Sequence, residues 1–86
     1  MTAPWRPALA PSVRLRHDAV RDADLLVMPE RVVVLSPTAA TILGACDGER
    51  TVTDIIDRLG RDFPDAPLAR DVPEFLGQVR REGWVR

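Results

Sequence analysis

The stretch that decides the fold is "RVVVLSPTAATIL", residues 31–43, because the hydrophobic period changes within it. Residues 32–35 are four consecutive apolar residues, and a strand would point them alternately to its two faces. After Ser36 the apolar residues have helical spacing, i, i+3, i+4 and i+7, at Ala39, Ile42, Leu43 and Cys46. The sequence therefore predicts a strand that runs directly into a helix.

The start and the end of this helix carry their own signals. The Ser36 hydroxyl can cap the first free amides, and Pro37 suits the first helical position because it has no amide to satisfy. Gly48 can adopt the left-handed conformation that ends helices, so we expect the helix to end there. Cys46 would then lie on its buried stripe, as a small core residue.

Two further strands are predicted upstream. Val13, Leu15 and His17 alternate with two arginines, which is the period-two pattern of a half-buried strand over 13–17. Residues 25–28 and 31–35 are apolar runs separated only by Pro29 and Glu30, a connection short enough for an antiparallel hairpin. We expect a three-stranded sheet.

Two further helices are predicted downstream. Thr51 and Asp54 form a capping-box pattern at the start of one helix. The other has an apolar stripe and ends at Gly83; the stripe consists of Leu68, Val72, Phe75, Leu76 and Val79. Its start is open: Asp71 and Glu74 could cap it and place Pro73 in the first turn, or it begins near Pro67 and Pro73 must kink it.

The order is β-β-β-α-α-α, which defines an α+β class: a three-stranded antiparallel sheet followed by three helices. Residues 1–12 contain three prolines and are predicted to be a flexible Pro-rich arm or linker with little capacity for ladder pairing. Residues 13–86 form the predicted domain. The start does not resemble a signal peptide and no apolar run could span a bilayer, so we expect a cytoplasmic protein.

Composition argues against most catalytic and metal chemistry. With one cysteine and one histidine, the chain has no intrachain disulfide and no zinc-ligand set. No nucleophile with a base, carboxylate pair in a cleft or phosphate-binding glycine pattern is legible. We therefore expect no enzyme activity, no metal and no cofactor. His17 is interpreted as a structural histidine.

Nucleic-acid binding is also disfavoured. All twelve cationic residues are arginine, which codon bias in a GC-rich genome explains, and the net charge is −1. Phosphate neutralisation needs a basic stripe on one face, but both downstream helices mix acidic residues with their arginines. The charge pattern therefore favours a protein-interaction role over DNA binding.

Several short stretches resemble the PqqD family, whose members act in pyrroloquinoline quinone (PQQ) biosynthesis. They are "VRLRHD" at 13–18, "PERV" at 29–32, a strand ending in Ser before a helix, "CDGERTV" at 46–52 and "REGWV" at 81–85. The likeness covers residues 6–85. Two positions depart from the family pattern: Pro73 replaces a good helix former, and Trp84 replaces the commoner Leu.

The resemblance implies a winged helix-turn-helix-like fold that serves as a recognition element for ribosomally made, modified peptides. It implies a peptide chaperone that binds the precursor peptide PqqA and presents it to the radical SAM enzyme PqqE, without catalysing a reaction. Some members are fused behind PqqC, and the Pro-rich arm is compatible with such a linker.

The strand 31–35 is the expected docking site for the peptide. If 25–28 is the central strand, then 31–35 is an edge that neither charge nor proline protects. A peptide could add as a strand and place side chains between this strand and the third helix, with Phe75 at the groove margin and Arg80 meeting a carboxylate. Candidate peptide-binding residues are Arg31, Val32, Val33, Val34, Leu35, Ser36, Asp71, Phe75, Leu76, Val79 and Arg80.

Two alternatives remain open at this point. The strand could be central and buried, or its edge could pair with a second copy to give a dimer. We expect a monomer or a weak dimer. Under the docking hypothesis, replacing Val33 by proline is expected to remove one amide that pairs with the peptide.

Overall fold

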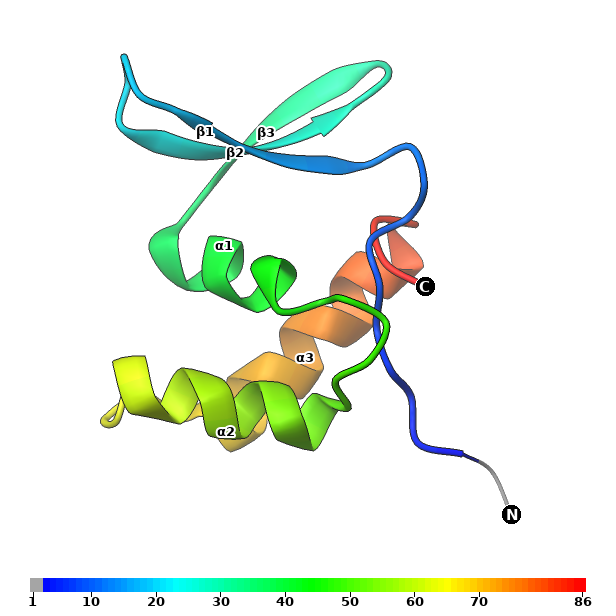
Figure 1. Ribbon diagram of the computed structural model, residues 1–86, viewed down its shortest axis with the longest axis vertical. Helices are drawn as coiled ribbons and strands as arrows, with labels where there is room; N and C mark the ends of the chain where they lie inside the picture. Colours follow the sequence, from blue (N-terminus) through cyan, green and yellow to red (C-terminus); the bar gives the residue numbers. More distant parts are fainter. Residues whose placement is uncertain (1–2) are drawn as a thin grey trace.

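The computed structural model describes residues 3–86 and contains three strands followed by three helices (Figure 1). The elements are β1 (Arg14–Asp18), β2 (Ala23–Met28), β3 (Arg31–Leu35), α1 (Pro37–Gly44), α2 (Val52–Asp62) and α3 (Leu68–Arg81). The predicted order and the α+β class are confirmed. The first strand begins and ends one residue later than predicted, and the second begins two residues earlier.

The sheet is antiparallel with the order β1-β2-β3, so β3 is an edge strand as predicted. Met28 pairs with Arg31 across the turn formed by Pro29 and Glu30. The alternative of a central buried β3 is therefore wrong. Among the described residues, β3 pairs with β2 alone.

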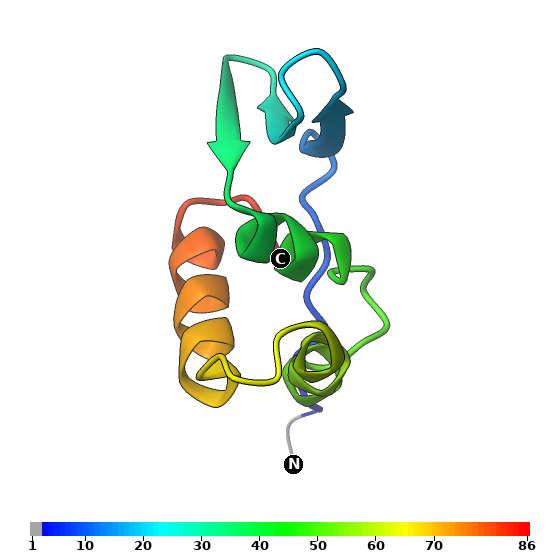
Figure 2. The same ribbon diagram turned by 90° about the vertical axis from the view of Figure 1, so that its left-hand side faces the viewer.

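All three helices lie on one side of the sheet, and its other face is bare (Figures 1 and 2). The core lies between the sheet and the helices. Leu26 on the central strand is fully buried there, as is Leu43 on α1. Hydrophobic residues of α2 and α3 complete this core, with Ile55, Leu59, Val72 and Leu76 at 0% exposure.

The junction of β3 and α1 forms as its sequence predicts, but α1 ends early. The Ser36 hydroxyl accepts a hydrogen bond from the Ala39 amide at 3.1 Å. The helix ends at Gly44, and the predicted end at Gly48 is wrong. Gly48 does have a positive φ of 78°, but it lies in a turn that the Asp47 carboxylate stabilises by accepting two backbone amides.

The bounds of α2 and α3 show which of the predicted helix signals form. Thr51 and Asp54 form the predicted capping box, and Gly83, with φ 81°, follows the end of α3. Because α3 begins at Leu68, Pro73 lies inside it, and the alternative start capped by Asp71 is wrong. Pro73 has no amide to donate to the carbonyl one turn earlier, so α3 lacks that hydrogen bond.

The N-terminal segment packs against the end of the chain. Pro7 is fully buried, and Ala8 and Leu9 form isolated bridges with Asp47 and Val85. The Ala8 amide donates to the Arg86 carbonyl at 3.2 Å, and the Arg86 amide donates back at 2.8 Å. The expectation of little ladder pairing was wrong for these residues, because an extended proline-rich chain still offers amides between its prolines. The boundary at residue 12 stays a prediction.

Candidate functional site

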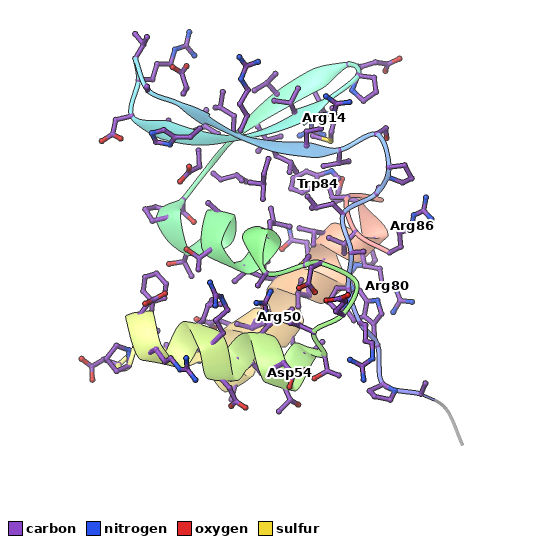
Figure 3. All side chains as sticks on the ribbon, viewed as in Figure 1. Arg14, Arg50, Asp54, Arg80, Trp84 and Arg86 are labelled. Atoms are coloured by element: carbon purple, nitrogen blue, oxygen red, sulfur yellow. The ribbon has the colours of Figure 1, made fainter. Side chains whose placement is uncertain are left out.

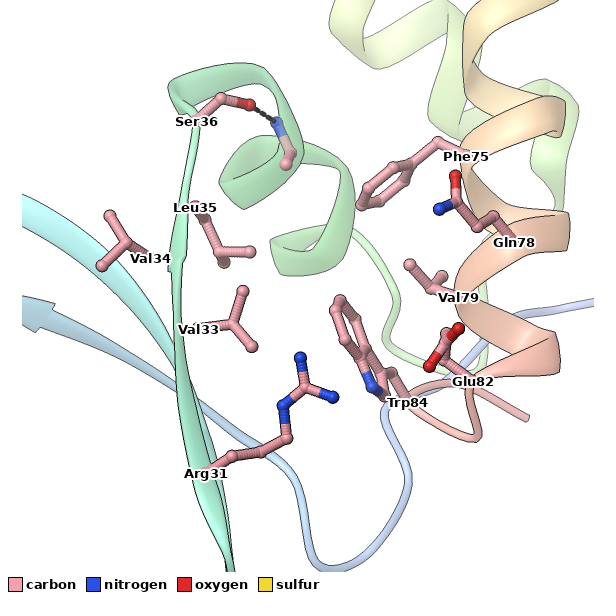
Figure 4. Close-up of a pocket in the computed structure, with 11 residues that line it drawn as sticks. Arg31, Val33, Val34, Leu35, Ser36, Phe75, Gln78, Val79, Glu82 and Trp84 are labelled. Carbon is pink, nitrogen blue, oxygen red and sulfur yellow. Dashed lines mark hydrogen bonds between the residues drawn. The ribbon is translucent and has the colours of Figure 1, made fainter.

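A groove of about 380 Å³ lies between β3 and α3 (Figure 4). It lies in the position predicted above for a bound peptide. Its walls come from β3 and the start of α1 on one side, and from α3 and the segment after it on the other. The lining residues are Arg31, Val33, Val34, Leu35, Ser36, Ala39, Phe75, Gln78, Val79, Glu82 and Trp84.

On the β3 wall, successive side chains point alternately into the groove and away from it. Val33 and Leu35 point toward α3, whereas the Val34 side chain points away from it (Figure 4). Val33 is half-buried and Leu35 is buried. Val32 and Val34 remain 56% and 65% exposed. The unusual run of four apolar residues therefore serves two faces, one that covers the core and one that is open.

The register fixes which backbone groups of β3 are free. In an antiparallel pair, successive residues direct their amide and carbonyl alternately toward the partner strand and away from it. Arg31 closes the turn against Met28, so Arg31 and Val33 point their backbone groups toward β2, and Val32 and Val34 point theirs outward. The expectation for Val33→Pro was wrong, because the amide of Val33 belongs to the β2–β3 ladder. Val34 is the residue whose amide faces the open edge.

The α3 wall is apolar at its base and polar at its rim. Val79 is buried at 2% exposure, and Phe75 is half-buried and points into the groove (Figure 4). Phe75 thus lies at the margin of the stripe, as predicted. Leu76 is fully buried and belongs to the core rather than to the groove. Gln78 and Glu82 are exposed and form the rim.

Trp84 closes one end of the groove and was not among the predicted site residues. Its own amide donates to the Val79 carbonyl, and its carbonyl accepts the Ala10 amide, both at 2.9 Å. These bonds hold its backbone beside α3, and the Arg31 guanidinium lies 5.7 Å from the centre of its ring. The signal available in the sequence was a large aromatic residue directly after the glycine that ends the helix.

Besides Leu76, three further predicted site residues lie outside the groove. Val32 is on the opposite face of the sheet. Asp71 lies further along α3 and accepts a hydrogen bond from the Arg70 Nε at 3.0 Å. Arg80 lies beside the N-terminal segment (Figure 3), where its guanidinium stacks 4.4 Å from the centre of the Trp5 ring. The structure therefore does not bring Arg80 to the position in which it was expected to meet a peptide carboxylate.

The titratable groups outside the groove have structural roles. His17 Nδ1 lies 3.0 Å from the Asp24 carboxylate, and this hydrogen bond raises the pKa of His17. Burial raises the pKa of the Cys46 thiol to about 11, so the thiol stays protonated, and it donates to the Ile42 carbonyl at 3.3 Å. Both residues fit the structural interpretation given above.

Residues 3–86 contain neither a metal-holding cluster nor a membrane-spanning helix. No group of histidine, cysteine and acidic side chains there could hold a metal ion. No helix in this range is both long and apolar enough to cross a bilayer.

Comparison with known proteins identifies relatives along nearly the whole chain. A protein from Methylococcus capsulatus, named PqqA binding protein, is 33% identical over 78 residues, which is 91% of this chain and 84% of the relative. A PqqA binding protein from Pseudomonas entomophila is 35% identical over 80 residues, 92% of this chain and 88% of the relative.

Two solved structures share the fold. One is the solution NMR structure of the PqqD truncation of Methylobacterium extorquens PqqCD, which represents a functional, stand-alone recognition element for ribosomally synthesised and post-translationally modified peptides. It matches with a TM-score of 0.70 and 32% identity, over 99% of this chain and 96% of that one. The crystal structure of PqqD from Xanthomonas campestris matches with a TM-score of 0.51 and 33% identity, over 94% and 89%.

The sequence model of one family, described as coenzyme PQQ synthesis protein D, matches residues 25–85, a range that includes β3, α3 and both walls of the groove. The relatives named above are 33% and 35% identical over 91% and 92% of this chain. The chain therefore belongs to the PqqD family.

Proposed function

We propose that this protein binds the precursor peptide PqqA by adding it as a strand to the free edge of β3. The observation that carries the proposal is an unprotected strand edge directly beside an apolar groove. Natural proteins usually protect such edges with charge or proline, and residues 32–35 have neither. The relatives named PqqA binding protein support the identity of the peptide.

Backbone pairing would supply affinity and the groove would supply selectivity. The outward amides and carbonyls of Val32 and Val34 are the partners for the peptide backbone. Alternate peptide side chains would enter the groove against Val33 and Phe75. Arg31 at one end of the groove is the positive group available to a peptide carboxylate, in place of Arg80.

We further propose that the protein carries PqqA to the radical SAM enzyme PqqE and does not itself catalyse a reaction. No group of histidine, cysteine and acidic side chains within residues 3–86 could hold a metal ion, and the cysteine thiol is buried and protonated. The structural relative cut from a PqqCD chain supports an association with PqqC through the N-terminal segment.

The test is a titration of isotope-labelled protein with synthetic PqqA, followed by NMR. We expect the largest amide shifts in β3 and along Phe75–Trp84, with little change at the outer face of α2, around Arg58. Saturation with no shift in β3 would contradict the proposal. Size-exclusion chromatography of the protein alone tests the alternative: a stable dimer that PqqA does not dissociate would mean that the edge pairs with a second copy.

A further inference from the structure

The face of the sheet that the helices leave bare has a definite composition. The register places Arg14, Val27 and Val32 in one row across the three strands, and Arg16, Leu25 and Val34 in the next. Residues opposite one another in a sheet share a face. We call these six side chains the outer sheet face: four aliphatic side chains on β2 and β3, bordered by two arginines on β1. The next row on the same side, Asp18 and Ala23, lies beside it, and the Asp18 carboxylate pairs with Arg21.

The outer sheet face is open, and its charges are unpaired. Val32 and Val34 are more than half exposed, and both arginines are exposed. Each ion pair found within residues 3–86 uses other cations: His17, Arg21, Arg50 and Arg70. An apolar patch bordered by free charge is typical of a surface that binds a partner.

This face is continuous with the proposed peptide site. Val32 and Val34 supply both the outward backbone groups of the β3 edge and half of the aliphatic side chains on the outer sheet face. A strand added at the β3 edge would point alternate side chains into the groove and the others onto this face. The groove side is walled by α3 and Trp84, so the outer side leaves the side chains of the bound peptide open to a large protein.

The charges select the partner. The surface complementary to two unpaired arginines carries carboxylates, set beside apolar side chains that meet the four aliphatic ones. A second copy of this chain is a poor occupant, because this face of the copy offers no unpaired carboxylate to the two arginines. A polyanion such as nucleic acid is also poorly matched, since the face has only two positive charges and an apolar centre.

We propose that the outer sheet face, extended by the outward side chains of the bound peptide, is the docking surface for the enzyme that receives the peptide. This enzyme presents carboxylates among apolar side chains at the contact. The inference rests on the proposed function, because it needs the peptide on β3. It assigns one strand to two partners: its groove side to the peptide, its outer side to the enzyme.

The test compares two double charge reversals, with PqqA and purified PqqE as probes. Arg14→Glu/Arg16→Glu changes the outer sheet face, and Arg58→Glu/Arg61→Glu makes the same change on the exposed side of α2. We expect the first variant to bind the PqqE–PqqA pair at least about tenfold more weakly than the parent and to bind PqqA alone within about threefold. The α2 variant should stay within about threefold for both probes.

The outcomes separate the two proposals. Parent-like binding of PqqE and PqqA by Arg14→Glu/Arg16→Glu would overturn the inference and leave strand addition intact, whereas failure of the parent to bind PqqA would overturn the proposed function. Methyl NMR of the parent gives a second readout that does not depend on a variant. On adding PqqE to the PqqA complex, the methyl signals of Leu25, Val27, Val32 and Val34 should broaden, and broadening confined to helix methyls would also overturn the inference.

Discussion

The two edge strands of this sheet are opposites in composition. β1 reads "RLRHD", with a charged or titratable side chain at four of five positions, whereas β3 reads "RVVVL". Both present a row of free amides and carbonyls, because each pairs with β2 on one side only within the described chain. Charged edges resist further pairing, and apolar ones invite it. This sheet therefore has one closed edge and one open edge, and the open one borders the groove beside α3.

The largest expected effect is a loss of stability, and it tests whether the Val33 amide pairs with β2. Val33→Pro removes an amide from the β2–β3 ladder and should cost about 3 kcal/mol or more of stability. Chemical denaturation followed by circular dichroism measures this. A Val33→Pro protein that folds normally but no longer binds PqqA would show that the Val33 amide faces the open edge, contrary to the register.

The next effect concerns the wall that faces the open edge. Phe75→Ala should weaken PqqA binding at least about 30-fold, roughly 2 kcal/mol, with a modest loss of thermal stability, because Phe75 is only half-buried. Leu76→Ala is the matched control. It should cost about 2–5 kcal/mol of stability, because Leu76 is fully buried. Isothermal titration and thermal melts separate the two, and unfolding of Phe75→Ala would assign this residue to the core.

A smaller effect isolates the edge amide itself. Val34→Pro removes an outward amide without touching the β2 ladder, so the fold should survive, and PqqA affinity should fall about tenfold, the worth of roughly one hydrogen bond. Val34→Thr keeps the amide and changes the side chain, and should bind within about threefold. Equal affinities for the proline and threonine variants would show that the peptide does not pair with β3.

The smallest effect is expected on the closed edge. His17→Ala should leave PqqA affinity unchanged within about tenfold. The Asp24 carboxylate raises the pKa of His17 in the folded protein, so its stabilising contribution is present below the unfolded value of about 6.5 and is lost as the pH rises through the folded pKa. The variant should have a lower melting temperature than the parent near pH 5 and the same melting temperature near pH 9. A difference that persists at the higher pH would mean that the His17 ring stabilises by packing.

The predictable parts of this protein have local causes. The β3–α1 junction, the hairpin at Pro29 and the capping box at Thr51 each depend on residues within a few positions of one another. Phe75 could be placed at the groove margin because helical spacing alone separates the centre of a stripe from its edge. Edge position for β3 followed from the order of the strands.

The unpredicted parts depend on contacts between distant residues. Arg80 was expected at the groove, but the ring that holds it, Trp5, lies in a segment predicted to be a flexible arm. Trp84 entered the groove wall because Ala10 fixes its backbone from the other end of the chain. The early end of α1 follows from the turn built around Asp47, which packs beside Ala8. No pattern of neighbouring residues in the sequence predicts these contacts.

The hydrogen bonds between Ala8 and Arg86 have a consequence for the order of folding. They join residues near opposite ends of the sequence, so they close the largest loop in the molecule and carry the highest loop-closure entropy. We therefore expect these contacts to form late, after the hairpin and the helices. The same N-terminal segment also holds Trp84, whose carbonyl accepts a hydrogen bond from the Ala10 amide. We therefore expect the end of the groove that Trp84 closes to be the last part of the domain to assemble. It should also be the first part to open in native-state hydrogen exchange.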